Sequence, residues 1–435
     1  MCINTKIKNG FDKKRDKMSN ELDGIFESFD KKLIFKDKSV LQNNYQPKEI
    51  LYREEQIKQI ASILAPILRG ERPSNLFLYG KTGTGKTLSV QYVKEGLLKR
   101  ADTKQNDFVL RIEYLNCKMK KISDTEYRIL AELIRKLGGE VPDTGLPTEA
   151  VYNRFIDLID SEKQLVILIL DEIDQTVKKI SDGFLYNLTR LNSELSKSQI
   201  CVVGISNDLT FLEGLDPRVR SSLSEEEIIF PPYNAMQLRE ILKIRAKEVF
   251  KENVLGDGVI EKCAAFAARE HGDARRALDL LRIAGELAER DGSKRVLLKH
   301  IDESNNKIER DKILDVVKSE PKQFQMVLYS IIKLAQKNSN SQTVLGQQGD
   351  LKKNDVIFTG DIYNHYQDLC LKYKMEVLTQ RRVSDIIQEF DMLGIINVRV
   401  ISKGRGGRMR EIRLAISSNI VEKVKEIIEN SLNYN

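Results

Sequence analysis

The chain has few of the side chains that build metal or thiol sites. Its 435 residues include three histidines and five cysteines, and the cysteines are scattered without the paired spacing of a metal site. Cys201 and Cys263 lie inside apolar patterns, which indicates small buried hydrophobic residues. We therefore expect neither zinc chemistry nor histidine-based catalysis.

Long apolar runs are also missing from the sequence. No stretch approaches the roughly eighteen residues needed to cross a bilayer, and the N-terminus lacks the apolar core of a secretory signal. These absences predict a cytoplasmic protein with no membrane partner. The composition, 41% hydrophobic and 31% charged, is typical of a globular protein, and the length suits two or three domains.

Positive charge is concentrated near the C-terminus rather than spread evenly. The formal net charge of the chain is only +7. One stretch of fifteen residues nevertheless holds six basic side chains and one acid, namely Arg399, Lys403, Arg405, Arg408, Arg410 and Arg413 against Glu411. A local excess of this kind favours a polyanionic partner.

Short apolar runs alternate with helical patterns between Leu41 and Phe230. The expected strands are residues 76–79, 108–115, 165–170, 200–205 and 228–230. The run "LVILIL" is apolar at every position, as in a parallel strand covered on both faces. Strands interleaved with helices predict a layered α/β domain with right-handed crossovers.

Composition and pattern divide the chain into four regions. The start is polar and lysine-rich, and the strand signals stop after "PPY" at 231–233. Near the C-terminus, helical patterns precede two β-like runs joined by "KGRGGRM", which is the order of a winged helix. We predict a flexible extension at 1–40, an α/β domain at 41–232, a helical domain at 233–310 and a winged-helix domain at 319–420.

A glycine-rich segment follows the first expected strand in "NLFLYGKTGTGKTLSV" (75–90). Gly80, Gly85, Lys86 and Thr87 fit the pattern G-x-x-x-x-G-K-[ST]. In this pattern the backbone N–H groups and the helix N-terminus face phosphate, the lysine reaches the β- and γ-phosphates, and the threonine binds Mg²⁺. The predicted nucleotide contacts are Gly80, Lys81, Thr82, Gly83, Thr84, Gly85, Lys86, Thr87 and Leu88.

Polar side chains follow two later strands. In "LVILILDEID" we expect Asp171 to hold Mg²⁺ together with Thr87, and Glu172 to orient or deprotonate an attacking water. The alternative for the acids is a simple helix cap. Asn207, after the next strand, is placed to touch the γ-phosphate or the lytic water, although it could also be an ordinary turn residue.

This combination resembles the AAA+ ATPases, whose helical lid carries an arginine sensor. "HGDARRALDLL" looks like that sensor segment, which implies that Arg275 reaches the γ-phosphate; otherwise it is a solvated helix arginine. The resemblance implies a five-stranded parallel sheet plus a helical lid, with ATP or ADP and Mg²⁺ as cofactors. The catalytic residues would be Lys86, Asp171, Glu172, Asn207 and Arg275.

Further stretches resemble archaeal replication initiators of the origin recognition and cell division control type. In "YQPKEILYREEQI" (45–57), Tyr45, Pro47, Arg53 and Glu54 match the segment that packs on adenine in that family, and the first three are the predicted nucleotide contacts. Tyr233 of "FPPY" matches a further nucleotide contact. "VPDTGLPTEAVYNR" (141–154) resembles an inserted helical element that contacts DNA.

The last domain resembles the winged helix of the same family. Thr379 can cap a helix whose apolar face is formed by Val383, Ile386, Ile387 and Phe390. The opposite face and the basic turn then contact duplex DNA, unless they are a solvated face or a site for an acidic protein. The predicted DNA contacts are Arg381, Arg382, Ser384, Lys403, Arg405, Gly406, Arg408 and Arg410.

One position departs from related ATPases, which place an arginine finger where this chain has Ser222. Arg218 and Arg220 are the nearby candidates for reaching a neighbouring molecule's γ-phosphate. We therefore expect slow hydrolysis that acts as a switch rather than a motor, with self-association on DNA left open.

Taken together, the resemblance implies an ATP-dependent initiator that binds duplex DNA at replication origins. Such a protein helps to recruit or load the minichromosome maintenance helicase. Two alternatives share many of its features. One is an ATP-switched winged-helix transcription regulator, and the other is an ATPase of the clamp-loader or helicase-loader type.

Overall fold

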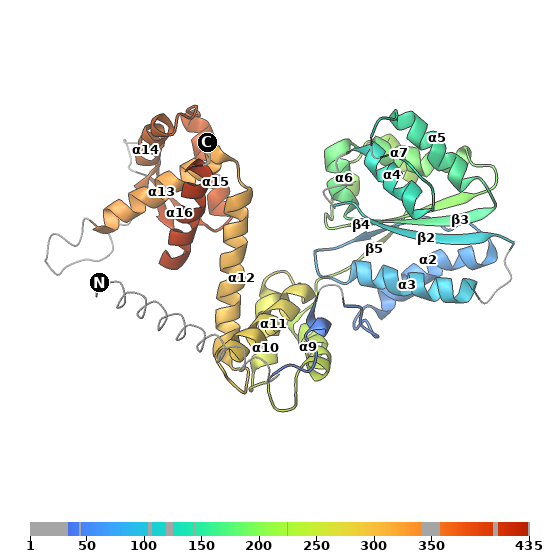
Figure 1. Ribbon diagram of the computed structural model, residues 1–435, viewed down its shortest axis with the longest axis horizontal. Helices are drawn as coiled ribbons and strands as arrows, with labels where there is room; N and C mark the ends of the chain where they lie inside the picture. The colour runs from blue at the N-terminus through green and yellow to red at the C-terminus, as the bar shows by residue number, and fades with distance from the viewer. Residues whose placement is uncertain are drawn as a thin grey trace, which may run out of the picture. The chain divides into compact units, whose positions relative to one another are not determined.

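The computed structural model forms two compact units, Met1–Ser304 and Asn305–Asn435 (Figure 1). The boundary falls inside helix α12 (Leu298–Ser319), which belongs to both units. The structure describes residues 34–42, 45–102, 107–118, 125–142, 144–223, 225–340, 357–402 and 408–433. None of the helices in these ranges combines the length and apolar character needed to cross a membrane.

The first unit is built on a parallel sheet of five strands in the order β2-β3-β4-β1-β5. The expected parallel sheet is therefore confirmed. Strand β3 lies between two neighbours and is buried along its whole length, which explains why its sequence is almost continuously apolar. The strands are β1 (Asn75–Tyr79), β2 (Val109–Asn116), β3 (Gln164–Asp171), β4 (Gln199–Ser206) and β5 (Glu225–Ile229).

Helices cover both faces of this sheet, as Figure 1 shows for α2 and α3 on one face and α4 to α7 on the other. Because side chains alternate along a strand, Leu76 and Leu78 join the core under α2 and α3, while Phe77 and Tyr79 join the other core. The helices are α2 (Glu54–Leu64), α3 (Lys86–Ala101), α4 (Glu126–Lys136), α5 (Thr148–Ile159), α6 (Ile173–Ile180), α7 (Gly183–Arg190) and α8 (Pro217–Leu223). Short 3-10 turns occur at Ala65–Arg69, Leu191–Ser193 and Phe211–Gly214.

A helical lid follows the sheet. It consists of α9 (Ala235–Val249), α10 (Val259–Arg269), α11 (Ala274–Arg290) and the start of α12. The side chain of Asn234 and that of Gln237 form a capping box at the start of α9, so the helix begins directly after the sheet domain ends. The helical character expected after residue 233 is present.

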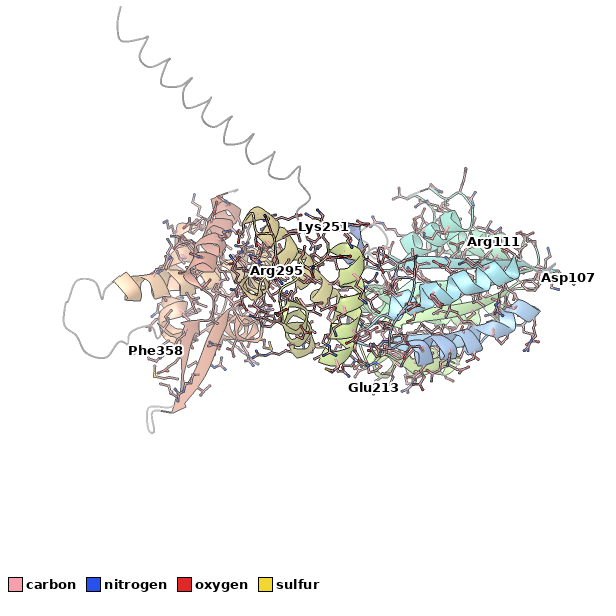
Figure 2. The ribbon with its side chains drawn as sticks, turned by 90° about the horizontal axis from the view of Figure 1, so that it is seen from below. Asp107, Arg111, Glu213, Lys251, Arg295 and Phe358 are labelled. Carbon is pink, nitrogen blue, oxygen red and sulfur yellow. The ribbon has the colours of Figure 1, made fainter. Side chains whose placement is uncertain are left out.

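Residues 34–42 differ from the expectation of a flexible extension up to residue 40. The side chains of Ile34, Phe35 and Leu41 are buried, and the segment includes a short 3-10 turn, η1 (Ser39–Leu41). The backbone N–H of Lys251, labelled in Figure 2, donates to the carbonyl oxygen of Ile34 at 3.1 Å. The apolar residues in this part of the chain therefore pack on the lid, because burial removes them from water. Residues 1–33 lie outside the described part.

The second unit is a winged helix. Its elements are α13 (Lys322–Asn340), β6 (Ile357–Phe358), α14 (Thr359–Lys372), α15 (Gln380–Met392), β7 (Ile396–Ser402), β8 (Arg408–Leu414) and α16 (Ser418–Asn433). The three strands pair antiparallel in the order β6-β8-β7. The Thr379 side chain accepts a hydrogen bond from the backbone N–H of Arg382, as its capping role predicted. Val424 and Ile428 of α16 join the same core, so the core extends beyond residue 420.

Candidate functional site

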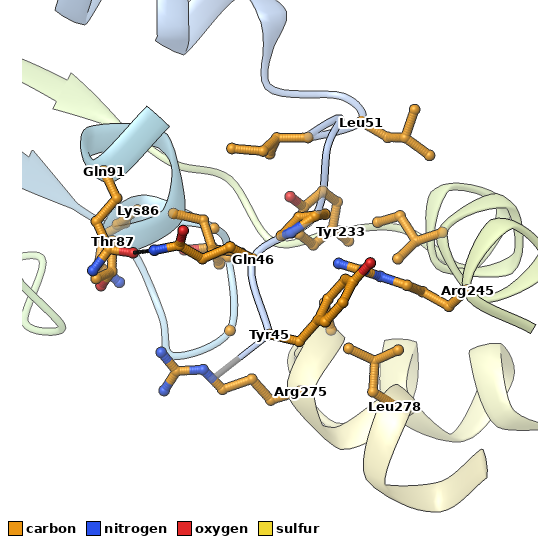
Figure 3. A pocket seen from close by; sticks show the side chains of 18 of the residues that line it. Tyr45, Gln46, Leu51, Lys86, Thr87, Gln91, Tyr233, Arg245, Arg275 and Leu278 are labelled. Carbon is orange, nitrogen blue, oxygen red and sulfur yellow. Dashed lines mark hydrogen bonds between the residues drawn. The ribbon is translucent and has the colours of Figure 1, made fainter. Parts of the chain in front are cut away.

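A cavity of about 600 Å³ lies where the carboxyl edge of the sheet faces the lid (Figure 3). The register of the parallel strands brings the end of β3 beside the end of β4 and the end of β4 beside that of β1. The glycine-rich loop after β1, Asp171 after β3 and Asn207 after β4 therefore meet in one place. Residues 82–88 of the loop line the cavity, together with Asp171, Glu172 and Asn207.

The glycines of the loop are required by close contacts. Gly83 has φ of 72°, and a Cβ there would lie 1.7 Å from Oδ1 of Asp273 on the lid. Gly85 has φ of 92°, and its Cβ would lie 2.9 Å from the Tyr233 hydroxyl oxygen. A side chain at either position would thus clash as well as strain the backbone.

Lys86 begins helix α3 and points back into the loop. Its Nζ donates to the carbonyl oxygens of Gly80 at 2.6 Å and Lys81 at 2.9 Å, and to Oδ1 of Asn207 at 3.0 Å. Burial lowers the pKa of Lys86 to about 8, because desolvation disfavours the charged ammonium; Asp171 opposes this shift and Arg275 adds to it. The amine is thus held close to the position that a phosphate group would occupy.

Thr87 and Asp171 lie side by side, as the sequence predicted. The Thr87 hydroxyl donates to Oδ2 of Asp171 at 2.8 Å. The hydroxyl of Tyr114, on strand β2, donates to the same oxygen at 2.8 Å, and burial followed by the nearby Asp171 charge raises the pKa of Tyr114. The sequence reasoning missed Tyr114, because nothing but the pairing of β2 with β3 brings it to the carboxylate.

Glu172 and Asn207 each have a partner that the sequence did not identify. Glu172 adopts a left-handed conformation (φ 57°), and its carboxylate lies 3.3 Å from the Nζ of Lys118. Asp174 is buried, and its Oδ1 accepts from the backbone N–H of Asn207 at 3.3 Å. This bond fixes the loop that presents the Asn207 side chain to Lys86.

The lid contacts the glycine-rich loop directly through the start of α11. Asp273 caps this helix by accepting from the backbone N–H of Arg275 at 2.7 Å. The backbone N–H of Ala274 donates to the carbonyl oxygen of Gly83 at 3.2 Å. Arg275 lines the cavity and extends from the lid toward the loop (Figure 3).

Tyr45, Pro47 and Tyr233 also line the cavity. Tyr45 donates from its hydroxyl to Oε2 of Glu248 at 2.8 Å, and its ring centroid lies 4.5 Å from the guanidinium carbon of Arg245. Figure 3 shows the two side chains together. Arg245 was not anticipated, because a single arginine in a charged helix carries no distinguishing signal.

Arg53 is placed behind the cavity rather than on its lining. Its side chain is buried and donates to the carbonyl oxygens of Thr84 at 2.8 Å, Tyr52 at 2.8 Å and Pro231 at 2.6 Å. Its guanidinium carbon also lies 3.8 Å from the ring centroid of Tyr233. The residue thus joins the glycine-rich loop to the end of the sheet domain, and any contact of Arg53 with nucleotide stays a prediction.

The two candidate arginine fingers lie on α8, and neither lines this cavity. Arg218 is highly exposed and forms an ion pair with Asp216 at 3.1 Å. Arg220 is exposed as well. Ser222 donates to the carbonyl oxygen of Val219 at 2.8 Å. The geometry leaves both arginines available to another molecule.

In the second unit, the predicted DNA contacts fall on α15 and the strand that follows the basic turn. The guanidinium of Arg410 on β8 donates to the Ser384 hydroxyl on α15 at 2.9 Å, so the helix and the wing strand are joined. Arg381 is exposed, and Arg382 lies 3.7 Å from Glu389. Lys403, Arg405 and Gly406 lie outside the described residues, and Arg408 is described only as the first residue of β8.

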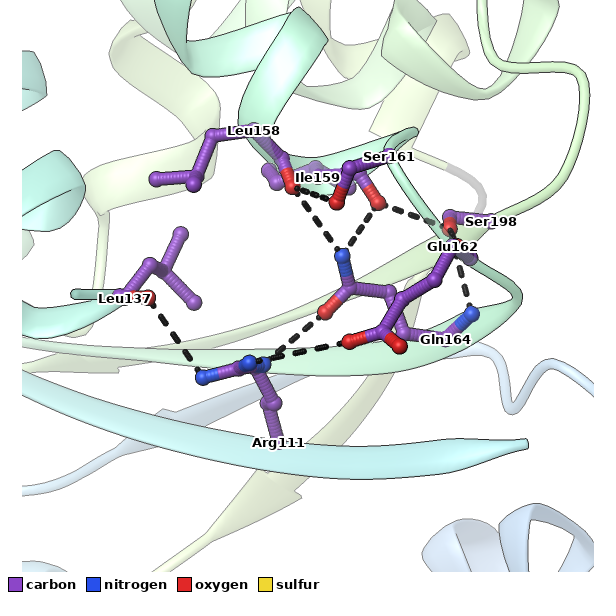
Figure 4. Close-up of polar contacts among 8 residues, drawn as sticks. All are labelled: Arg111, Leu137, Leu158, Ile159, Ser161, Glu162, Gln164 and Ser198. Atoms are coloured by element: carbon purple, nitrogen blue, oxygen red, sulfur yellow. Dashed lines mark hydrogen bonds and ion pairs between the residues drawn. The ribbon is translucent and has the colours of Figure 1, made fainter. Parts of the chain in front are cut away.

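The element predicted at 141–154 leads into helix α5, which is anchored by polar contacts (Figure 4). Gln164 at the start of β3 is buried, and its amide donates to the carbonyl oxygens of Leu158 and Ile159. Its Oε1 accepts from Nε of Arg111 at 3.0 Å. The Ser198 hydroxyl donates to the Ile159 carbonyl oxygen at 2.8 Å. The end of α5 is thereby held to two strands.

Comparison with family models defines the class of protein. An AAA domain matches residues 69–210, a Cdc6 AAA+ ATPase-type lid domain matches 239–306, and the C-terminal winged-helix domain of CDC6 matches 315–424. The chain is an AAA+ ATPase with a C-terminal winged helix. Membership of this class supports nucleotide binding and ATPase activity.

Individual relatives define the family more closely. The chain is 50% identical over 410 residues to the ORC1-type DNA replication protein of Thermococcus onnurineus, covering 93% of this chain and 94% of that one. It is 51% identical over 409 residues to the one from Pyrococcus furiosus, covering 93% of each. The structure of the Aeropyrum pernix ORC1 protein in complex with DNA matches with a TM-score of 0.76 and 41% identity, covering 93% and 99%. The chain belongs to the family of ORC1-type DNA replication proteins, which confirms the resemblance.

Proposed function

We infer that this protein is an ATP-dependent replication initiator that binds duplex DNA at origins. The observation that carries the inference is the near full-length identity of about half to ORC1-type DNA replication proteins. The DNA-bound state of the Aeropyrum pernix ORC1 protein supports duplex DNA as the ligand. Recruitment of the minichromosome maintenance helicase, and self-association on DNA, are the functions we expect to follow from origin binding.

Mg²⁺ fits the oxygen atoms at the base of the cavity. Thr87 and Asp171 offer a hydroxyl and a carboxylate 2.8 Å apart, and such hard oxygen ligands suit this ion. Among the described residues there is no cluster of three or more His, Cys, Asp or Glu side chains that could hold a metal alone. The nucleotide phosphates and water would thus complete the shell. When bound, the ion would neutralise charge on the phosphates.

The chain's own residues divide the remaining work. Lys86 and the loop N–H groups would bind the phosphates, and Asn207 would orient the γ-phosphate or the attacking water. Glu172 would accept a proton from that water once its carboxylate leaves Lys118, 3.3 Å away. Since neither Arg218 nor Arg220 lines the cavity, we expect hydrolysis to stay slow without a second molecule.

The lid supplies the switch in this proposal. ATP differs from ADP by the phosphate that Arg275 would contact, so the two nucleotides would favour different positions of α11. The lid continues through α12 into the second unit. A change at the lid would therefore alter how the winged helix and the 141–154 element grip one duplex.

The decisive experiment measures duplex binding in each nucleotide state. We expect protein with ATP and Mg²⁺ to give a different affinity or footprint on origin-region DNA from protein with ADP, measured by anisotropy titration and nuclease protection. Lys86→Ala should abolish this difference, because the variant loses the amine that binds the phosphates.

Lys99→Ala is the matched control, since Lys99 is an exposed lysine near the other end of α3. Its nucleotide dependence should equal that of the unmodified chain. Indistinguishable DNA binding with ATP and ADP in the unmodified protein would contradict the switch and leave only a constitutive DNA-binding protein.

A further inference from the structure

The segment ahead of α2 runs from the lid to the sheet domain across the nucleotide cavity. We call residues 34–42 and 45–51 the strap. At its lid end, the backbone N–H of Lys36 donates to the Val249 carbonyl oxygen at 2.6 Å, and Phe35 pairs antiparallel with Phe250. The rings of Phe35 and Phe250 are stacked with centroids 5.0 Å apart. The strap thus begins with both backbone and ring contacts to the lid.

The Phe35 ring occupies a socket that glycine creates in helix α11. Phe35 is only 2% exposed, and a Cβ at Gly285 would lie 2.3 Å from its Cζ atom. Gly285 stands in the interior of a helix of 17 residues, where alanine would be the better helix former. The absence of a side chain at this position therefore serves the docking of Phe35.

A charged contact reinforces this socket. The Nζ of Lys38 lies 2.8 Å from Oε2 of Glu289, one turn further along α11, and 4.5 Å from the Phe35 ring centroid. Glu289 is mostly buried, since its side chain is 11% exposed. The Lys38 side chain is 43% exposed, so the pair is partly shielded and is screened somewhat less than a fully exposed pair.

The middle of the strap forms one wall of the cavity. Val40, Tyr45, Pro47 and Ile50 all line it. Tyr45 is tied to α9 of the lid by its contacts with Glu248 at 2.8 Å and Arg245 at 4.5 Å (Figure 3). A nucleotide seated on the glycine-rich loop would have its base beneath this wall.

The other end of the strap is fastened to the sheet domain. The side-chain amide of Gln46 donates to Oε1 of Gln91 on α3 at 3.1 Å. Arg53, two residues after the strap, donates to three carbonyl oxygens, of which that of Thr84 belongs to the glycine-rich loop. The strap is therefore attached on both sides of the cavity, and the lid cannot open far unless one attachment is released.

We propose that the strap retains bound nucleotide and that release of Phe35 from its socket limits the rate of nucleotide exchange. This inference rests on the proposed nucleotide binding and adds its regulation. A partner or a DNA state that draws Phe35 away from α11 would then trigger exchange. Such a partner would need an apolar surface that binds the Phe35 ring in place of α11.

The test measures the dissociation rate of a fluorescent ADP analogue from the full-length protein by stopped-flow displacement with unlabelled ADP. Phe35→Ala removes the ring, and Gly285→Ala fills the socket from the other side. Both substitutions should speed dissociation of the analogue by roughly tenfold or more, because the first removes the buried Phe35 ring and the second displaces it. Gly96→Ala in α3 is the control, since a Cβ there meets nothing within 4 Å; its release rate should be unchanged.

Exchanging the charges of Lys38 and Glu289 gives a second test, which remains informative if Phe35→Ala or Gly285→Ala fails to fold. Lys38→Glu and Glu289→Lys should each speed release, and the double variant should restore slower release. If the analogue binds but dissociates from every variant at the same rate as from the unmodified protein, the proposed role of the strap is wrong. An unmodified protein that binds no analogue at all overturns the proposed nucleotide function instead.

Discussion

At the scale of single residues, Lys86 illustrates how the fold prepares a charge for its ligand. The amine is only 5% exposed and is satisfied by two carbonyl oxygens and the Asn207 side chain. Neutral acceptors compensate a buried ammonium incompletely, so its pKa falls to about 8. A polyphosphate would supply the missing negative charge and raise the pKa again.

This difference makes nucleotide binding depend on pH. Between about pH 8 and the higher pKa of the complex, the free protein has lost a proton that the complex retains. Binding should therefore take up a proton in this window, and affinity should fall by up to about tenfold for each unit of pH increase. Calorimetry at pH 9 in two buffers of different ionisation enthalpy measures the uptake directly.

Lys86→Arg provides the control, because a guanidinium stays protonated throughout this range. Whatever affinity the variant keeps should vary less with pH between 8 and 9.5. Equal proton uptake by the unmodified protein and by Lys86→Arg would show that a group other than Lys86 takes up the proton on nucleotide binding.

At the scale of elements, a buried amide helps to position the end of α5, whose Val151, Phe155 and Ile159 also pack in the core. Gln164 connects the last turn of α5 with Arg111 on β2, while Ser198 fastens the same turn to the start of β4. Hydrogen bonds are directional, so these contacts restrict the orientation of the helix end more than apolar contacts do. The helix that begins in the element at 141–154 is therefore joined at its end to the start of β3.

Removing that amide should loosen the helix end without unfolding the sheet. Gln164→Ala removes one donor from each of the carbonyl oxygens of Leu158 and Ile159, which should lower the local opening free energy by about 1–3 kcal/mol. Hydrogen exchange of the α5 amides in the native protein reports this quantity. Gln199→Ala, an exposed change at the start of β4, should alter protection by less than about 0.5 kcal/mol. Equal protection in the two variants would show that packing alone holds α5.

At the scale of the whole molecule, the basic stretch and the nucleotide cavity lie in different units. The net charge of +7 is small for 435 residues, yet the stretch 399–413 holds six basic residues against one acid. In the structure, residues 399–402 of this stretch belong to β7 and residues 408–413 to β8, and Arg410 also contacts Ser384 of α15. The nucleotide site lies in the other unit. A substitution in the basic stretch is therefore not expected to change the residues that line the nucleotide cavity.

The salt dependence of DNA binding tests this separation. Arg405→Ala combined with Arg408→Ala should reduce the slope of log affinity against log salt by about 1–2, because each lost phosphate contact removes about 0.9. Nucleotide affinity should stay the same. Lys423→Ala, an exposed change on α16, controls for the loss of a positive charge. A double variant with the unmodified slope would argue against the wing as a phosphate-binding surface.

Features with a local cause could be predicted from the amino-acid sequence. The strands follow from apolar runs, the glycine-rich loop from its G-x-x-x-x-G-K-[ST] pattern, and the start of α15 from the Thr379 cap. Each depends on residues a few positions apart, so pattern and stereochemistry suffice to predict it.

Contacts between segments that are far apart in the chain could not be predicted in this way. Tyr114 reaches Asp171 through strand pairing, Arg53 turns away from the cavity to bind three carbonyl oxygens, and Phe35 docks on Gly285 across 250 residues of sequence. A tyrosine, an arginine or a phenylalanine has no local signal for such a partner. The role of such a residue depends on which other residues the folded chain places within a few ångströms of its side chain.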